Sequence, residues 1–228
     1  MRRPHSVLSP QSSVLLLLLF LSGCTLLSVA AYKLKPPETV HPKYTNLVNQ
    51  SIGVMVWADR GIRIDWPSLQ LDVANGVERK LKEQTVDAKG KPKAKTLMGA
   101  TYPTQPGSIA RYQRDHPEVE AMTIADVAPK FGVSRLIYVE IEDFTTRAGQ
   151  AIDLFRGQLR ATVRVVEVEP DGKANVAYTW ENVQATFPPK APPEGVANVG
   201  DARIYSGTVD AFTTTIAQLF YSYQVEEP

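Results

Sequence analysis

The stretch that decides the fold covers residues 155–187 and reads FRGQLRATVRVVEVEPDGKANVAYTWENVQATF. Apolar residues recur at every second position of its first half and share one face of an extended strand: Leu159, Ala161, Val163 and Val165. The tetrad Pro170-Asp171-Gly172-Lys173 then breaks the alternation with residues that tolerate positive φ, as a hairpin turn requires. The stretch therefore predicts two long antiparallel strands, at 155–169 and 174–187.

The chain before this hairpin alternates between strand and helix patterns. Short apolar runs predict buried strands at 51–57 and 134–144, and a further short strand is expected at 96–100. Apolar residues at every fourth position predict an amphipathic helix that starts near Trp66-Pro67: Leu69, Val73, Val77 and Leu81. Other helices are predicted at 106–116, at 124–131 with Gly132 ending it, and at 208–223.

This order of elements predicts an α/β (α+β) fold. We expect a mixed sheet of about five strands with helices packed on it, in the order β-α-β-α-β-β-β-α. The early βα units favour a parallel part of the sheet, whereas the hairpin adds an antiparallel side.

The first residues predict export and a lipid anchor. Arg2 and Arg3 precede the apolar run at 14–21, which is too short to span a membrane. The tetrad LSGC at 21–24 resembles the lipobox of bacterial lipoproteins. That resemblance implies a signal peptide at 1–23 and fatty acyl chains on Cys24. An uncleaved signal anchor is the alternative, because 14–31 almost reaches spanning length.

The lipobox resemblance also implies a location and a domain plan. We expect the protein in the bacterial cell envelope, and Thr25 after the cysteine favours the outer membrane, facing the periplasm. Prolines and lysines at 24–46 predict a flexible tether, followed by a single envelope domain at 47–228. The basic stretch KGKPKAK at 89–95 is interpreted as a solvated turn, with contact to anionic lipid as the alternative.

Composition argues against several classes of function. The chain has 228 residues, with 25 Lys and Arg against 24 Asp and Glu, so we expect no nucleic-acid partner. Its single Cys excludes an intramolecular disulfide and a Cys-based zinc site. His41 and His116 lie in no recognisable catalytic setting. The sequence therefore predicts no catalytic residue, no metal and no cofactor, and a protein that is not an enzyme.

The first candidate binding surface follows the buried strand at 51–57. Open α/β sheets place ligand sites at the carboxyl ends of their strands, and Trp and Arg are enriched in binding hot spots. The loop there holds five residues of interest: Asp59, Arg60, Arg63, Asp65 and Trp66. The alternative is structural, with Asp–Arg pairs holding the loop and Trp66 covering the core.

The second candidate surface lies on the strands themselves. Glu140 and Glu142 share one face of their strand, and Arg160 and Arg164 have the same spacing on the expected neighbour. Facing charges of this kind predict a cross-strand ladder of ion pairs. A partner-facing surface and a pair of catalytic carboxylates are the alternatives.

Three segments within residues 51–223 carry a second resemblance, which is one of pattern. The segment APKFGVSRLIYVEI at 128–141, the strand RATVRVVEV at 160–168 and the closing helix resemble the TolB N-terminal, LpoB, PelC and CsgG-like group. Val133-Ser134-Arg135 departs from the usual Ala-Asp-Tyr, and the long insertions of a CsgG-type channel are missing.

This second resemblance implies a role rather than a chemistry. It implies a non-enzymatic docking, assembly or accessory module that contacts the membrane through its lipid anchor and binds another envelope protein. It leaves open whether the chain forms a homo-oligomer. A small-ligand-binding or enzymatic domain that uses the loop at 59–66 is the alternative.

Overall fold

The computed structural model describes residues 38–87, 89–149 and 153–225. They form two compact units, of which the larger spans His41–Tyr223 and is called the body below. Apart from the main sheet, β1 (Glu38–Val40) pairs with β6 (Tyr223–Val225). The signal peptide at 1–23, Cys24 and the tether up to residue 37 lie outside the described residues.

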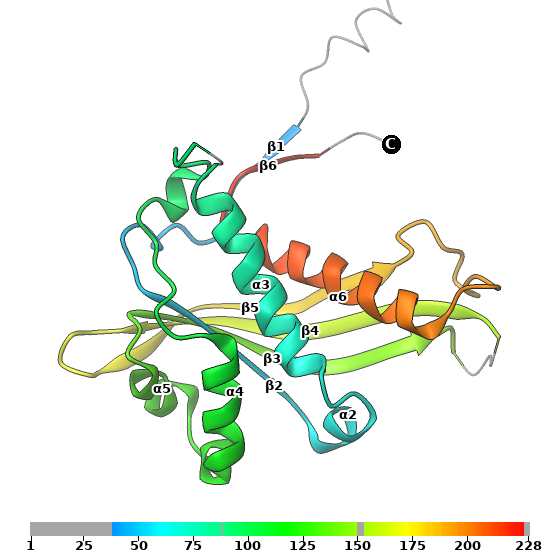
Figure 1. Ribbon diagram of the computed structural model, residues 1–228, viewed down its shortest axis with the longest axis horizontal. Coiled ribbons are helices and arrows are strands. Elements are labelled where there is room, and N and C mark those ends of the chain that lie inside the picture. The colour runs from blue at the N-terminus through cyan, green and yellow to red at the C-terminus, as the bar shows by residue number, and fades with distance from the viewer. Residues whose placement is uncertain (1–37, 88, 150–152, 226–228) are drawn as a thin grey trace, which may run out of the picture. The chain divides into compact units, whose positions relative to one another are not determined.

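The body is built on a four-stranded mixed sheet with the strand order β2-β3-β4-β5 (Figure 1). β2 (Ile52–Ala58) runs parallel to β3 (Arg135–Arg147), which pairs antiparallel with β4 (Phe155–Val168). β4 then pairs antiparallel with β5 (Ala174–Phe187) through a turn in which Gly172 has a φ of 86°. The mixed α/β fold and its long hairpin are thus confirmed.

Two long helices, α3 (Leu69–Thr85) and α6 (Asp201–Ala217), cover one face of the sheet (Figure 1). The stripe predicted for α3 is confirmed, because its four apolar residues are all 0% exposed: Leu69, Val73, Val77 and Leu81. α6 approaches β4 closely at Gly157, where a Cβ atom would lie 1.7 Å from the Thr208 hydroxyl oxygen. This layer and the strands beneath it form the main hydrophobic core.

The opposite face of the sheet is covered at one end by four short helical segments: α4 (Pro106–Asp115), η2 (Pro117–Ala121), α5 (Ile124–Val127) and η3 (Ala128–Phe131). Their apolar side chains pack on Met55, Leu136 and Val166 to form a second, smaller core. Gly132 ends η3 with a φ of 64°, as the sequence predicts. The rest of this face holds the charged side chains of β3 and β4.

The expected fifth strand at 96–100 is wrong. The chain forms a 3₁₀ turn there, η1 (Lys95–Leu97), and only Thr101 makes a bridge to Ser51. Leu97 is fully buried in the main core, so this segment contributes to the core from a turn and not from a strand.

The last helix also has different bounds, since it was expected at 208–223 and α6 spans Asp201–Ala217. It ends early because the next turn binds other segments. The Leu219 carbonyl accepts hydrogen bonds from the backbone N–H groups of Lys43 (2.7 Å) and Tyr44 (3.2 Å). The Phe220 carbonyl accepts one from the Thr96 hydroxyl (2.5 Å).

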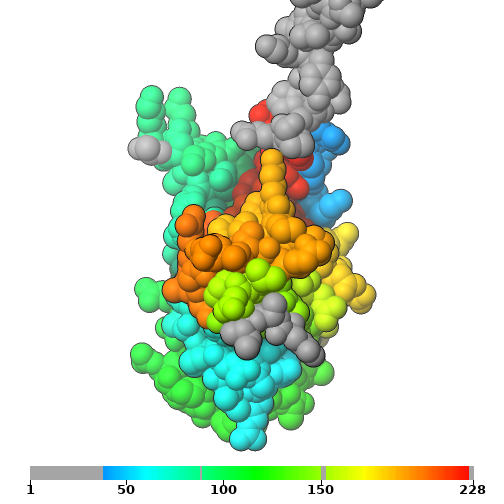
Figure 2. Space-filling view, turned by 90° about the vertical axis from the view of Figure 1, so that its right-hand side faces the viewer, coloured from blue at the N-terminus to red at the C-terminus, as the bar shows by residue number. Residues whose placement is uncertain are grey.

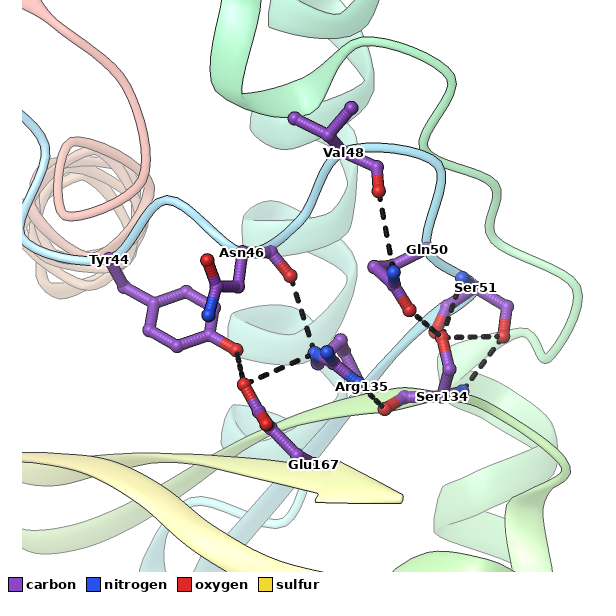
Figure 3. A network of polar contacts seen from close by, with 8 residues as sticks. All are labelled: Tyr44, Asn46, Val48, Gln50, Ser51, Ser134, Arg135 and Glu167. Carbon is purple, nitrogen blue, oxygen red and sulfur yellow. Dashed lines mark hydrogen bonds and ion pairs between the residues drawn. The ribbon is translucent and has the colours of Figure 1, made fainter. Parts of the chain in front are cut away.

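The body begins before residue 47, where the domain was expected to start. Tyr44 is 6% exposed, and its hydroxyl donates to Glu167 near the end of β4 (2.5 Å). Arg135 bridges the same carboxylate (3.6 Å) and the Asn46 carbonyl (3.3 Å) (Figure 3). Residues 43–46 therefore pack on the body, although the sequence placed them in the tether.

Within the described residues, no helix combines the length and the apolar character that crossing a membrane requires.

Candidate functional site

The segment after β2 forms a short helix, α2 (Arg60–Asp65), where the sequence suggested a loop. Asp59 is its N-cap, and its carboxylate accepts a hydrogen bond from the Ile62 backbone N–H (2.9 Å). Arg60 and Asp65 are exposed on this helix. Figure 2 shows the α2 region (cyan) below the β3–β4 end of the sheet (yellow-green) and the start of α6 (orange).

Trp66 turns toward the main core and not toward solvent. Its ring meets Phe144 edge-on, with 4.9 Å between centroids, and stacks on Tyr205 at 5.6 Å. The Tyr205 hydroxyl donates to Asp72 (2.7 Å), and burial raises the pKa of Tyr205 to about 12. The structural alternative for Trp66, a cover for the core, is therefore the one the structure supports.

Arg63 leaves α2 on the other side. Its guanidinium pairs with Glu120 of η2 (2.6 Å), and its side chain is 34% exposed. The Nε atom of Arg63 is buried and has no hydrogen-bond partner among the described residues. A buried N–H without an acceptor destabilises the fold, so a ligand that supplies an acceptor to this atom would gain binding free energy.

The charged ladder predicted on β3 and β4 is confirmed. Arg164 pairs with Glu140 (2.5 Å), and Arg160 pairs with Glu142 (3.4 Å). Glu142 also accepts a hydrogen bond from the Thr162 hydroxyl (2.6 Å). The ladder lies on the sheet face that α4 and its neighbours leave partly uncovered.

The two predicted surfaces meet in one groove, called the α4 groove below. It has a volume of about 1120 Å³ and lies among α2, α3, α4, η2 and the strands β2, β3 and β4. Arg63, Glu140 and Arg164 line it. The other predicted site residues lie outside its lining: Asp59, Arg60, Asp65, Trp66, Glu142 and Arg160.

The edge of β2 is closed at the groove by two glutamines. The Val56 carbonyl accepts hydrogen bonds from the side-chain amides of Gln70 (2.8 Å) and Gln113 (3.1 Å). Gln70 comes from α3 and Gln113 from α4, and both also line the groove. Because an unpaired strand edge can recruit another strand, this double cap protects β2 as well as shaping the site.

The lining of the α4 groove carries a cationic excess. Its lining holds four arginines and two glutamates, and Arg114 also pairs with Asp115 outside the lining (3.2 Å): Arg63, Arg111, Arg114 and Arg164 against Glu120 and Glu140. Sequence reasoning missed Arg111 and Arg114, because a predicted helix does not reveal which of its faces borders a cavity. Apolar side chains also line the groove, including Trp57, Leu71 and Met122.

The ionisable side chains of the groove are largely engaged with one another. Both of its carboxylates are held in ion pairs with arginine, and burial raises the pKa of the Tyr138 hydroxyl, which stays protonated at neutral pH. Within the described residues, no three or more His, Cys, Asp or Glu side chains are grouped so that they could hold a metal ion. The groove offers arginine charge and apolar surface to an anionic ligand.

The chain was compared with families, curated proteins and solved structures. No family model and no curated protein matches the chain. Among solved structures, a PelC dodecamer from Paraburkholderia phytofirmans has a TM-score of 0.40 at 10% identity, covering 81% of this chain and 97% of that one. Lipoprotein GNA1162 from Neisseria meningitidis has a TM-score of 0.38 at 13% identity, covering 74% and 98%.

Proposed function

We propose that the protein is a lipid-anchored module of the bacterial envelope that docks a segment of a partner protein in the α4 groove, without catalysis. The observation that carries this proposal is the cationic, partly apolar lining of the groove. The anchor and the location are supported by the LSGC tetrad at 21–24. The outer membrane, facing the periplasm, is the side that Thr25 favours.

The size and composition of the groove support a protein segment as its occupant. A pocket for one small molecule usually has a volume of about 300–1,000 Å³, and the α4 groove exceeds that range at about 1120 Å³. Arginine and tryptophan are the side chains enriched in protein-binding hot spots. The positive excess would steer and orient an acidic segment, so we expect the bound stretch to carry Asp or Glu beside apolar residues.

Photo-crosslinking in the native cell tests the docking. A photoreactive amino acid replaces Leu71, which lines the groove and is 38% exposed. We expect one defined product, whose partner peptide is acidic. Arg111→Glu should abolish this product, because it reverses a groove charge.

Two controls make the crosslinking decisive. Arg203→Glu makes the same reversal on an exposed arginine of α6 and should leave the product unchanged. The same probe at Tyr178, on β5 outside the groove, should give no such product. A product that survives Arg111→Glu would show that the groove is not the docking site.

The lipid anchor has its own test. Cells are fed a palmitate analogue with a clickable tag, and the protein is isolated and examined for the tag. We expect label on the wild-type protein and none on Cys24→Ala, because Cys24 is the only cysteine of the chain. Equal labelling of the two proteins, or no label on either, would contradict the anchor.

One observation favours a second candidate, the binding of a small anion. Arg63 and Arg164 both line the groove, the Nε of Arg63 has no hydrogen-bond partner among the described residues, and arginine guanidinium groups suit a carboxylate or phosphate. A thermal-shift screen of the purified protein against such anions separates the two candidates. A shift that Arg63→Gln abolishes would favour the small ligand over the partner segment.

A further inference from the structure

A second surface, on a different part of the body from the groove, is rich in lysine. The loop between α3 and η1 carries Lys89, Lys91 and Lys93, followed by Lys95 at the start of η1, and all four are exposed. Figure 2 shows this part of the chain projecting from the body at the upper left, in green. Lys43, where the N-terminal chain joins the body, is exposed as well. These five lysines are called the lysine end below.

Hydrogen bonds bring the loop and the entering chain to the same place. Lys43 donates its backbone N–H to the Leu219 carbonyl (2.7 Å). The Thr96 hydroxyl, at the base of the lysine loop, donates to the Phe220 carbonyl (2.5 Å). Because Leu219 and Phe220 are consecutive, the loop and the point of chain entry lie side by side on the turn after α6.

The positive charge of the lysine end is not neutralised within the described residues. None of its five lysines forms an ion pair there. The nearest acid in sequence, Asp87, accepts hydrogen bonds from the backbone N–H groups of Lys89 (2.8 Å) and Lys91 (2.9 Å). It holds the shape of the loop and leaves the ammonium groups to solvent.

Exposed apolar side chains flank these charges. Val86, just before the loop, is 47% exposed, and Met98, just after η1, is 46% exposed. Each belongs to the small set of large apolar side chains that the described residues leave exposed. Basic side chains around exposed apolar ones are typical of surfaces that sit on a bilayer, where ammonium groups reach the headgroups and apolar groups enter the interface.

We propose that the lysine end lies on the membrane and binds the headgroups of anionic phospholipids. This inference rests on the proposed anchor, because Cys24 precedes Lys43 by only 19 residues, which reach at most about 65 Å when fully extended. The anchor thereby confines the body to the membrane, and the lysine end fixes which side faces it. Clusters of four to eight basic residues beside an anchor are the usual form of such contacts.

A fluorescence experiment on the lipidated full chain tests the contact. Met98→Cys gives a single free thiol, since acylation occupies Cys24, and it is labelled with an environment-sensitive dye. The protein is reconstituted in vesicles of phosphatidylcholine alone or with phosphatidylglycerol. We expect a blue shift of the dye and quenching by brominated lipid only in the vesicles with phosphatidylglycerol. Salt at 1 M should abolish both the blue shift and the quenching, because the Debye screening length falls from about 10 Å at 0.1 M to about 3 Å at 1 M.

Matched lysine variants test whether the quenching depends on the lysine end. Lys91→Gln with Lys93→Gln should reduce the quenching strongly, since each lysine near an anionic surface contributes about fivefold to binding. Lys130→Gln with Lys190→Gln removes the same charge from exposed positions outside the lysine end and should leave the quenching unchanged. Equal quenching in both kinds of vesicle, or no effect of the Lys91 and Lys93 changes, would overturn the proposal.

The outcome also separates this inference from the anchor. A protein that fails to float with vesicles lacks the anchor, which contradicts the proposed function. A protein that floats while its Met98 label stays unquenched keeps the anchor and refutes the lysine contact. A photoreactive probe at Met98 tests the alternative of a protein partner. If the Lys91 and Lys93 changes remove a crosslink from this probe to an acidic protein but leave the lipid quenching unchanged, the surface binds protein and the proposal is wrong.

Discussion

Gly157 determines how closely α6 can approach the sheet. Because a Cβ atom there would lie 1.7 Å from the Thr208 hydroxyl oxygen and 2.9 Å from Ile204, Gly157→Ala must push the helix away from β4. We expect it to lower the free energy of unfolding by about 1–3 kcal/mol, measured by urea denaturation. Gly107→Ala is the control, because nothing lies within 4 Å of its added methyl. Equal stability of the two variants would contradict the tight contact.

Single residues also show where sequence reasoning stops. The partners of Glu140 and Glu142 could be predicted, because alternation along a strand fixes which side chains face a neighbour. The direction of Trp66 was one of two predicted alternatives, whereas that of Arg63 toward Glu120 was not predicted, because a loop was expected and the chain forms a six-residue helix. Three positions apart, one enters the groove and the other covers the core.

At the scale of elements, β2 depends on helices for the completion of its edge. Gln70 and Gln113 donate to one carbonyl, that of Val56, from two different helices. We expect Gln70→Ala or Gln113→Ala alone to have a small effect, since the other amide still donates. The double variant leaves the buried Val56 carbonyl without a side-chain donor. It should lower the free energy of unfolding by about 1–3 kcal/mol, which is more than the two single changes together. Urea unfolding of all four proteins measures this coupling, and strictly additive effects would refute it.

Helices and strands were predicted well where the pattern that determines them lies in neighbouring residues. The strands at 134–144 and 155–187 were predicted within a few residues, because their alternation lies in the sequence itself. The start of α6 lies seven residues before the predicted one, and Gly207 in this first part is the position where the Phe187 ring meets the helix. Its end is set by hydrogen bonds to Lys43 and Thr96, more than 120 residues away.

For the whole molecule, buried tyrosines predict a loss of stability in alkali. Burial is the main cause that raises the pKa of Tyr102 and of Tyr205 to about 12, and it raises those of Tyr44, Tyr138 and Tyr221 as well. Above pH 10 the unfolded chain releases protons that the folded chain keeps, so the free energy of unfolding falls as pH rises. Their stabilising contribution is complete below pH 10 and is lost as the pH rises through about 12.

The alkaline prediction can be checked with urea midpoints at pH 9, 10 and 11. We expect the wild-type midpoint to fall over this range and the Tyr205→Phe midpoint to fall less steeply. Tyr178→Phe removes an exposed tyrosine of β5, and its urea midpoint should follow that of the wild type. This control shows how much of the fall comes from other groups, such as lysines, that titrate in the same pH range. Parallel curves for wild type and Tyr205→Phe would remove Tyr205 as a cause.

The whole-molecule plan was the easiest part to predict and the groove the hardest. A mixed sheet follows from the order of the elements, whereas the α4 groove joins Arg63, Arg111 and Arg164, which are spread over a hundred residues. No periodicity links such positions. Their meeting depends on the packing of α4 against the sheet, which the sequence pattern does not specify.

The contacts that hold residues 43–46 on the body have a mechanical consequence. Any tension that reaches the body along its N-terminal chain acts first at residues 43–46, which are held by the buried Tyr44 ring, the Glu167 and Arg135 contacts and the two backbone bonds to Leu219. The sheet carries that load only after these contacts break. With the lipid anchor that we propose at Cys24, these contacts would separate before tension on the anchor reaches the core.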